Sequence, residues 1–537
     1  MTLEWKNLDR TSAYTQLRHT DTLINLPDEL TPERIASWKV PASAGLMFHY
    51  AASLLTETDL NRLQALADEQ QLIEKYKAVL NGDRVNTGEN RRVLHQLSRG
   101  QAGKDVIENG TNLRSFYEEQ NSRVRDFAQK VHSGEIKGST GKAFDTVVQI
   151  GIGGSDLGPR ALYLALKQTQ TPKMKAFFVS NVDPDDAAEV ISLINPETTL
   201  FILVSKSGTT QETLANRDLI IARMKARGIS GYNPAGHIIA VTSKTSPLAD
   251  SSEVLDAFYI DDYIGGRYSS TSAVGGAVLS LALGPDTFDE LLSGAHEADK
   301  AALEPDIRKN AALLDALIGV FNRNVLGLPS TAVLPYSQAL SRFPAHLQQL
   351  DMESNGKSVN RRGEPISYQT GPVVFGEPGT NGQHSFYQLL HQGSDVIPLQ
   401  FIGFRQSQKG EDVETFGSTS QTKLNANLAA QIIAFAKGSP NENPNKNFNG
   451  MRPSTLLSAG KLDARVLGAL LAHFENKVMF QGFCWNLNSF DQEGVQLGKI
   501  LTGSVLNGSS EDKALEAYAS ILGVGNGFSS QETPGNQ

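Results

Sequence analysis

The pattern of apolar and polar positions divides the chain into a helical beginning and a long mixed α/β region. Up to about residue 120, apolar residues recur three and four positions apart, as at Leu60, Leu63 and Ala67, which is typical of amphipathic helices. From Asp145 onward, short β-branched runs alternate with helix-length amphipathic stretches. This alternation predicts parallel sheets with helices on both faces. No strands are expected before residue 120.

The strand-like runs fall into two series, which predict two doubly wound units. The first series is Thr146–Ile150, Ala176–Val179, Thr199–Val204, Ile238–Thr242 and Ala257–Ile260. After a helical connector near residues 286–325, the second series is Thr331–Pro335, Pro372–Phe375 and Val396–Phe401. Helical patterns return at Ala459–Asn476 and Asp512–Leu522, and the turn-rich segment Gly438–Gly450 predicts a loop.

These patterns predict an α/β protein in four parts. We expect a helical arm over residues 1–120, a first α/β domain over 121–285, a second over 286–510, and a C-terminal helix with a polar tail over 511–537. The full length of 537 residues agrees with several core-forming units, because one domain usually takes about 100–200 residues.

Composition limits which binding partners and which cellular compartment we expect. The 49 Lys and Arg residues against 58 Asp and Glu give a net charge of −9, which argues against a nucleic-acid-binding surface. The single cysteine, Cys484, excludes an intrachain disulfide and a multi-cysteine metal cluster. We expect a reducing compartment. No secretory signal and no stretch of 18 apolar residues is found, so we expect no membrane partner.

Glycines gather directly after the first predicted strand, in the segment Gly151–Pro159 that contains Gly154 and Ser155. The segment resembles a dinucleotide-binding fingerprint but does not match it, because its last glycine would fall on Asp156. Two interpretations stand. The segment is either a tight strand-to-helix turn or a turn that leaves room for a small polar ligand at the carboxyl end of the sheet.

Hydroxyl groups gather where the third predicted strand runs into a helix. Ser205, Lys206, Ser207 and Thr210 lie there around Gly208. One hydroxyl would suffice for an N-cap, whereas several hydroxyls and an ammonium group at a helix N-terminus favour an anion. This segment therefore predicts a phosphomonoester site.

An arginine and a carboxylate are the next candidates for chemistry. Arg267 follows two glycines and is either a surface group or one that reaches a developing oxyanion. Gln349 and Glu353 lie four residues apart in a helix that we expect to end at Gly356. Because the helix dipole disfavours a carboxylate near the carboxyl end, Glu353 is either a general base or the ion-pair partner of Lys357.

Three further side chains belong to later segments. His384 is expected in the first turn of a helix, where the dipole opposes protonation, although a lone histidine is more often structural. Gln492 and Lys499 lie seven residues apart and would share one face of a helix.

Together these segments resemble the glucose-6-phosphate isomerase family, also called phosphoglucose isomerase. The resemblance covers most of the chain, and the segments that carry it are Asn86–His95, Gly151–Pro159, Ser205–Thr213, Gly265–Ser269, Leu347–Lys357, Gly379–His384 and Gly482–Lys499. It implies a cytoplasmic aldose–ketose isomerase with two flavodoxin-like sugar-isomerase domains and N- and C-terminal helical extensions. It also implies a homodimer whose active sites are shared between subunits, and no metal or other cofactor.

The resemblance implies a role for each candidate residue. The residues that would hold the 6-phosphate are Gly154, Ser155, Ser205, Lys206, Ser207 and Thr210. Glu353 would move a proton between C1 and C2, and Arg267 would stabilise the enediolate. Ring opening would be assisted by Lys499 and by His384, which this family supplies from the partner subunit. Gln349 and Gln492 would position the substrate.

Two alternatives keep part of this assignment. An amination of the glucosamine-6-phosphate synthase kind needs an N-terminal cysteine nucleophile, whereas Cys484 is the only cysteine. A sugar-phosphate-binding regulator would need the hydroxyl segment but not Glu353, His384 and Lys499 together. All three are present, and the isomerase is therefore the favoured hypothesis.

Overall fold

The computed structural model describes residues 3–19 and 23–524. The chain folds as two compact units, Met1–Phe490 and Asp491–Gln537. The division between these units lies at none of the domain boundaries expected at residues 120, 285 and 510. The expected domains remain a prediction. Part of the expected polar tail, residues 525–537, lies outside the described residues.

The first sheet has five parallel strands in the order β6-β5-β7-β8-β9. Its strands are β5 (Thr146–Ile150), β6 (Lys175–Val179), β7 (Thr199–Val204), β8 (Ile238–Thr242) and β9 (Asp256–Tyr259). Every residue of β5, β7 and β8 is buried, as expected for strands covered by helices on both faces. The chain's first strand here lies between its second and third, which is the flavodoxin-like order. The expected fold class is confirmed.

The second sheet has six strands in the order β1-β2-β15-β12-β10-β11. Its strands are β1 (Lys39–Ser43), β2 (Leu46–His49), β10 (Ser330–Tyr336), β11 (Val373–Phe375), β12 (Leu399–Phe404) and β15 (Ser454–Ala459). The last four are mutually parallel, whereas β1 and β2 pair antiparallel at one edge. Two small hairpins lie outside both sheets, formed by β3 (Ile107–Glu108) with β4 (Thr111–Asn112) and by β13 (Glu414–Thr415) with β14 (Ser418–Thr419).

Two expectations about this sheet are wrong. The N-terminal arm is not wholly helical, because β1 and β2 extend the second sheet. Strand β1 is short and contains Pro41, which suits an edge strand but weakens the strand signal. The helix expected from Ala459 begins at Ala464 instead, because Ala459 ends β15 and Asp463 caps the helix by accepting from the Val466 N–H. The loop expected over Gly438–Gly450 is confirmed and holds a short 3₁₀ turn, Pro444–Lys446, and an isolated bridge between Ser439 and Phe448.

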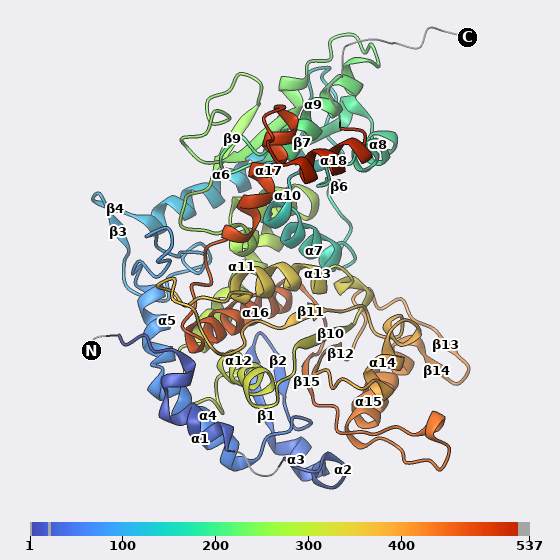
Figure 1. Ribbon diagram of the computed structural model, residues 1–537. Coiled ribbons are helices and arrows are strands. Elements are labelled where there is room, and N and C mark those ends of the chain that lie inside the picture. The colour runs from blue at the N-terminus through green and yellow to red at the C-terminus, as the bar shows by residue number, and fades with distance from the viewer. Residues whose placement is uncertain (1–2, 20–22, 525–537) are drawn as a thin grey trace. The chain divides into compact units, whose positions relative to one another are not determined.

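The helices cover both sheets and fill the space between them (Figure 1). In the N-terminal third they are α1 (Ser12–Arg18), α2 (Leu26–Glu29), α3 (Pro32–Ser37), α4 (Glu57–Glu69), α5 (Leu72–Leu80) and α6 (Leu113–Ser133). Around the first sheet follow α7 (Leu157–Leu166), α8 (Pro184–Leu193), α9 (Gln211–Lys225) and α10 (Ala273–Leu283). The remaining helices of the first unit are α11 (Pro285–Ala301), α12 (Ala311–Val320), α13 (Phe343–Gln348), α14 (Tyr387–Gln392), α15 (Ser420–Lys437) and α16 (Ala464–Cys484). The second unit holds α17 (Gln496–Leu506) and α18 (Lys513–Ile521).

Helix α16 forms the centre of the core and packs against α11 and α12. Every residue of α16 except Arg465 is buried, so its few charged side chains need partners inside the protein. Glu475 pairs with the buried Arg99, which also pairs with Asp299 at 3.3 Å. These partners come from distant segments and fix the N-terminal region on the core.

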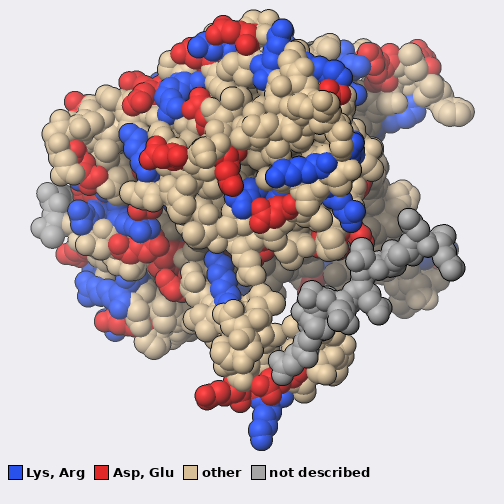
Figure 2. Space-filling view, turned by 90° about the horizontal axis from the view of Figure 1, so that it is seen from above, with Lys and Arg blue, Asp and Glu red and all other residues tan. Residues whose placement is uncertain are grey.

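The surface has no concentrated basic region on the face shown in Figure 2, where Lys and Arg are interspersed with Asp and Glu. Among the described residues, no helix is long and apolar enough to span a membrane. Likewise, no group of three or more His, Cys, Asp or Glu side chains in the described part of the chain is arranged to hold a metal ion.

Candidate active site

The hydroxyl-rich segment forms a cradle at the carboxyl end of β7, directly before α9. Ser205 Oγ and Thr210 Oγ1 lie 3.0 Å apart, and Ser207 Oγ accepts a hydrogen bond of 3.2 Å from the Thr209 N–H. Gly208 turns the chain with a φ of +69°, a conformation that favours glycine. Several hydroxyls therefore gather at the N-terminus of a helix, which suits an anionic group.

Lys206 connects this cradle to the loop that carries Arg267. Its ammonium group donates to the Ile264 carbonyl at 2.7 Å. Burial lowers the pKa of Lys206, although Asp262 and Asp261 act in the opposite direction. The side chain is therefore a partly buried cation, and its charge is screened less than that of an exposed lysine.

The glycine turn after β5 packs directly against the same loop. A Cβ on Gly154 would lie 2.1 Å from the carbonyl carbon of Gly266 and 2.7 Å from the Arg267 nitrogen. Gln149 on β5 fixes the turn, because its Nε2 donates to the Ser155 carbonyl at 2.7 Å. Only a residue without a side chain allows the two backbones to approach this closely.

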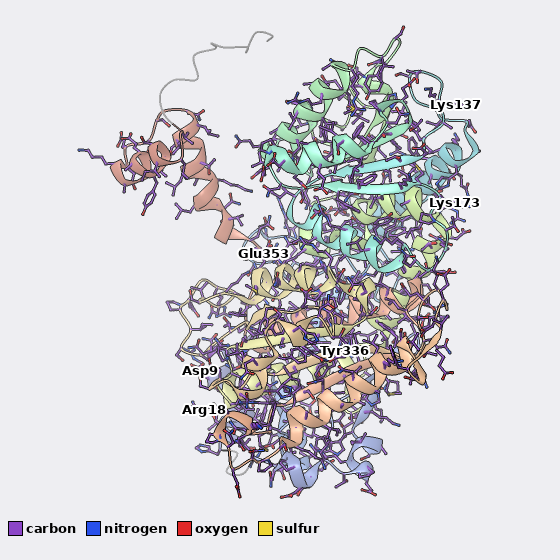
Figure 3. The ribbon with its side chains drawn as sticks, turned by 90° about the vertical axis from the view of Figure 1, so that its right-hand side faces the viewer. Asp9, Arg18, Lys137, Lys173, Tyr336 and Glu353 are labelled. Atoms are coloured by element: carbon purple, nitrogen blue, oxygen red, sulfur yellow. The ribbon has the colours of Figure 1, made fainter. Side chains whose placement is uncertain are left out.

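Arg267 is buried, with 1 % of its side chain exposed, and its guanidinium binds Glu353, Ser354 and Ser489. Nη1 donates to Glu353 Oε1 at 2.9 Å, Nε to Ser354 Oγ at 2.7 Å and Nη2 to the Ser489 carbonyl at 2.8 Å. The Glu353 side chain keeps 22 % exposure. A partly exposed carboxylate therefore lies against a fixed cation, and Figure 3 shows Glu353 between the parts of the first unit that hold the two sheets.

Glu353 ends a π-helical turn, Gln349–Glu353, that continues α13. Such turns are frequent at functional sites. Gln349 begins the turn, and its Nε2 lies 3.3 Å from the position that a Cβ would take on Gly153. The expected helix is therefore wound more loosely than expected, yet Gln349 and Glu353 reach neighbouring parts of the site, the glycine turn and Arg267.

Lys357, the alternative partner expected for Glu353, does not form an ion pair with it in this structure. Lys357 donates to the Asn488 carbonyl, and the ion pair of Glu353 is with Arg267.

His384 is exposed and lies in a short 3₁₀ turn, Gly382–His384. The expectation that His384 lies in the first turn of a helix is wrong, since α14 begins only at Tyr387 and the chain turns before it.

Gln492 and Lys499 lie in the second unit. Lys499 is on α17, but that helix begins at Gln496 after a short 3₁₀ turn, and Gln492 precedes both. The condition for a shared helix face is therefore not met. Their part in the site remains a prediction.

Ser354 and Tyr268 support Arg267, a role that the sequence pattern does not predict. Ser354 accepts from Arg267 Nε, and its Oγ lies 3.0 Å from the Tyr268 hydroxyl. Burial raises the pKa of Tyr268 to about 12, so this hydroxyl stays protonated and can donate. Each residue adjoins a candidate in the sequence, at positions 267 and 353, and that adjacency was the only signal available.

The site combines a partly buried lysine and several hydroxyls at one position with a carboxylate–guanidinium pair at another. The first group suits a phosphate. In the second, a carboxylate can accept a proton while a fixed cation stabilises the negative charge that results. This combination is suited to proton abstraction next to the carbonyl of a phosphorylated substrate.

Comparison with known proteins agrees with this chemistry. The sequence model of the family described as phosphoglucose isomerase matches residues 49–522. The chain is 59 % identical over 528 residues to the glucose-6-phosphate isomerase of Treponema denticola, covering 97 % of this chain and 100 % of that protein. It is 48 % identical to that of Borreliella afzelii over 525 residues, covering 96 % and 98 % of the two chains. The crystal structure of a glucose-6-phosphate isomerase from Chlamydia trachomatis superposes with a TM-score of 0.90 at 43 % identity, covering 97 % of this chain and 100 % of that one.

The contact between Gly154 and Gly266 gives an asymmetric prediction. We expect Gly154→Ala to lower the melting temperature and to destabilise the fold by about 1–3 kcal/mol, because its methyl group would overlap backbone atoms that cannot rotate away. Gly266→Ala is the matched control, since a Cβ there meets only Gly154 Cα at 3.8 Å. Equal melting temperatures for the two variants would contradict the described packing.

Proposed function

The chain belongs to the phosphoglucose isomerase family, and we infer from this that it catalyses the reversible isomerisation of D-glucose 6-phosphate to D-fructose 6-phosphate, a step of glycolysis and gluconeogenesis. The observation in the structure that best supports this is the carboxylate of Glu353 held at 2.9 Å by the buried Arg267. An aldose–ketose isomerase must move one proton between adjacent carbons, and this requires a carboxylate-type base beside a charge stabiliser.

We propose that Glu353 takes the proton from C2 of the open-chain aldose and returns it to C1. The C2–H electron pair becomes the C1=C2 bond of a cis-enediol, whose O1 carries negative charge as it forms. The O2 proton passes to O1 before the proton on Glu353 returns to C1, which leaves C2 as the carbonyl. Arg267 stabilises that charge, and because its guanidinium is already fixed by Ser354 and Ser489, little reorganisation accompanies the step. The reaction returns Glu353 to its starting state and needs no net oxidant.

The cradle formed by Ser205, Lys206, Ser207 and Thr210 binds the 6-phosphate in this proposal, with Gly154 and Ser155 on the adjoining turn. The phosphate does not react, so its binding energy is available to orient the other end of the sugar. Support comes from the positions of Lys206 and Gly154, which both contact the loop leading to Arg267.

Gln349 positions the substrate from the start of the π-helical turn, and we propose the same role for Gln492. Ring opening requires proton transfer at the ring oxygen, and we assign this to His384 and Lys499. His384 is exposed in the described chain, which is compatible with a position in the active site of a second copy. We therefore propose a homodimer with shared active sites, working in the cytoplasm.

The assignment of Glu353 predicts a turnover defect without a binding defect. In a coupled assay from fructose 6-phosphate to glucose 6-phosphate, Glu353→Gln should lower kcat by about 10²–10⁴-fold while KM changes little, because an amide cannot accept the proton. Glu290→Gln, at an exposed position of α11, is the control and should match the wild type. Equal rates for Glu353→Gln and wild type would exclude Glu353 as the base, and binding without turnover by the wild type would indicate a regulator.

The shared active site predicts complementation between two inactive chains. Glu353→Gln and His384→Ala homodimers should both be inactive, whereas hybrid dimers formed by subunit exchange should recover up to about half of the wild-type activity per hybrid, because one of the two shared sites is then intact. Exchange is verified by native mass spectrometry. No recovery after verified exchange would show that each site is built from one chain.

The lowered pKa of Lys206 predicts weaker phosphate binding at alkaline pH. As the pH rises through that lowered pKa, the ammonium group loses its charge, so the Kd of sorbitol 6-phosphate should rise at a lower pH than for an ordinary lysine. Lys206→Ala should weaken binding about 10–100-fold and remove this dependence. Lys206→Arg should also remove it, because a guanidinium keeps its charge. An unchanged pH profile in both variants would contradict the assignment.

A further inference from the structure

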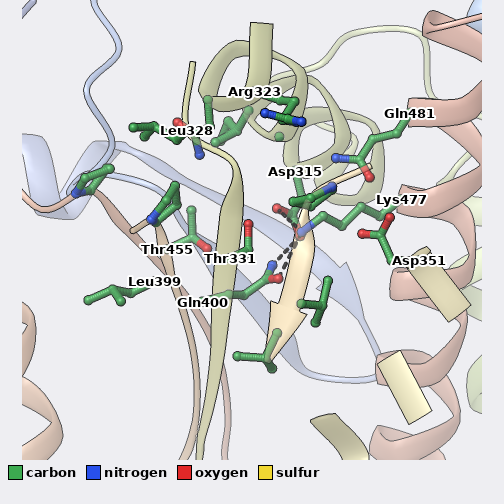
Figure 4. Close-up of a pocket in the computed structure, with 18 of the residues that line it drawn as sticks. Asp315, Arg323, Leu328, Thr331, Asp351, Leu399, Gln400, Thr455, Lys477 and Gln481 are labelled. Carbon is green, nitrogen blue, oxygen red and sulfur yellow. Dashed lines mark hydrogen bonds and ion pairs between the residues drawn. The ribbon is translucent and has the colours of Figure 1, made fainter. Parts of the chain in front are cut away.

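A second cavity lies at the amino-terminal ends of the parallel strands of the second sheet (Figure 4). The first residues of β12 and β15 line it, together with parts of α12 and α16. The ligand-binding edge of such a sheet is the opposite one, at the carboxyl ends of its strands, and no residue assigned to the isomerase site lines this cavity. The cavity has a volume of about 50 Å³, which is room for a few waters or one small ligand.

The floor of the cavity is charged and buried. Asp315 lies 3.1 Å from Lys477 Nζ and 3.0 Å from His473 Nε2, and it accepts from Gln400 Nε2 at 2.6 Å. Lys477 also donates to Gln400 Oε1 at 2.9 Å. Burial alone would raise the pKa of Asp315, but Lys477 and His473 hold it below its ordinary value. The charge of Lys477 is therefore already largely balanced by Asp315.

Two buried oxygen atoms, in side chains whose residues line the cavity, have no hydrogen-bond partner among the described residues. They are Oδ1 of Asp351 and Oε1 of Gln481, in side chains of residues that are only 7 % and 2 % exposed. Gln481 lies four residues after Lys477 on α16, hence on the same face, and Figure 4 shows both beside Asp351. Buried oxygens of this kind normally accept hydrogen bonds. A ligand that fits must donate them.

The lining carries charges of both signs. Asp351 adds a second carboxylate to a floor whose one ammonium group is already paired with Asp315. Arg323, at the edge of the cavity, is held by the Thr370 carbonyl at 2.7 Å and by Gln369 Oε1 at 3.1 Å. Burial raises the pKa of Asp351 to about 6, although Lys477 acts in the opposite direction. A donor that binds the unpaired Oδ1 would further favour the ionised carboxylate.

Part of the lining is apolar. Three prolines in it each precede a strand by one residue, Pro372 before β11, Pro398 before β12 and Pro453 before β15. Proline has no N–H group, so the lining has carbon surface and no backbone donors at these positions. A short hydrocarbon group attached to a polar head is therefore suited to this mixed lining.

We propose that this cavity binds a small ammonium-type cation, ammonium itself or a short primary alkylammonium, whose N–H groups donate to Asp351 and Gln481. Asp351 belongs to the same π-helical turn as Glu353, Gln349–Glu353. Binding there stiffens the turn and so influences the base on its other side. This second statement rests on the proposed function, whereas the binding itself does not.

Thermal unfolding tests the binding without any turnover. At about 100 mM, methylammonium chloride should raise the wild-type Tm by about 1–3 °C relative to sodium chloride, because a ligand that binds only the folded state stabilises it. Tetramethylammonium has the charge but no N–H donors and should give no such rise. Asp351→Asn should abolish the effect of methylammonium, and Asp395→Asn, at an exposed position, should keep it.

Equal shifts for methylammonium and tetramethylammonium, or a shift retained in Asp351→Asn, would overturn the site and leave a water-filled cavity. If Asp351→Asn does not fold, Gln481→Met removes an acceptor at similar volume and should likewise abolish the shift.

The coupling between the cavity and Glu353 is measured separately as a change in kcat of about twofold with methylammonium. A Tm shift with unchanged kcat would overturn the coupling alone, and a Tm shift in a chain without isomerase activity would overturn the proposed function and not the site.

Discussion

The burial of one guanidinium group, that of Arg267, determines how the candidate site is assembled. A buried cation must find partners for its N–H groups inside the protein, because the cost of leaving them unpaired is several kcal/mol. Arg267 obtains these partners from Glu353 and Ser354 on the π-helical turn and from the Ser489 carbonyl after α16. The backbone beside it packs on Gly154. One side chain thereby joins the end of the first sheet to two segments of the rest of the unit.

Much of the fold could be predicted because the strands of the first sheet are buried on both faces. Such strands read as continuous β-branched and aliphatic runs, and β5, β7 and β8 lie where those runs occur. The cradle could also be predicted, since excess hydroxyls at the start of a helix are a local feature. The segment from Ser205 to Thr210 is continuous in sequence, and its hydrogen bonds are formed within it.

Other features depend on contacts between distant parts of the chain, and the sequence alone does not show them. Strand β2 is only four residues long and gains its place by pairing with β15, with His49 opposite Leu456. The π-helical turn has the same apolar spacing as an ordinary helix over one turn, so the looser winding leaves no mark in the pattern. The support of Arg267 by Tyr268 and Ser354 is likewise visible only once the two segments are packed together.

The π-helical turn brings these observations together, because its two sides face different environments. Gln349 and Glu353 reach the candidate active site, whereas Asp351 lines the buried cavity behind it.

In the proposed mechanism, Glu353 is the base acting on C1 and C2. A crystal structure with a six-carbon sugar-phosphate analogue of the enediol tests it most directly. We expect the Glu353 carboxylate within about 3.2 Å of the groups at C1 and C2, with the phosphate on Ser205–Thr210. A carboxylate turned away from those carbons, with another base in its place, would contradict the account.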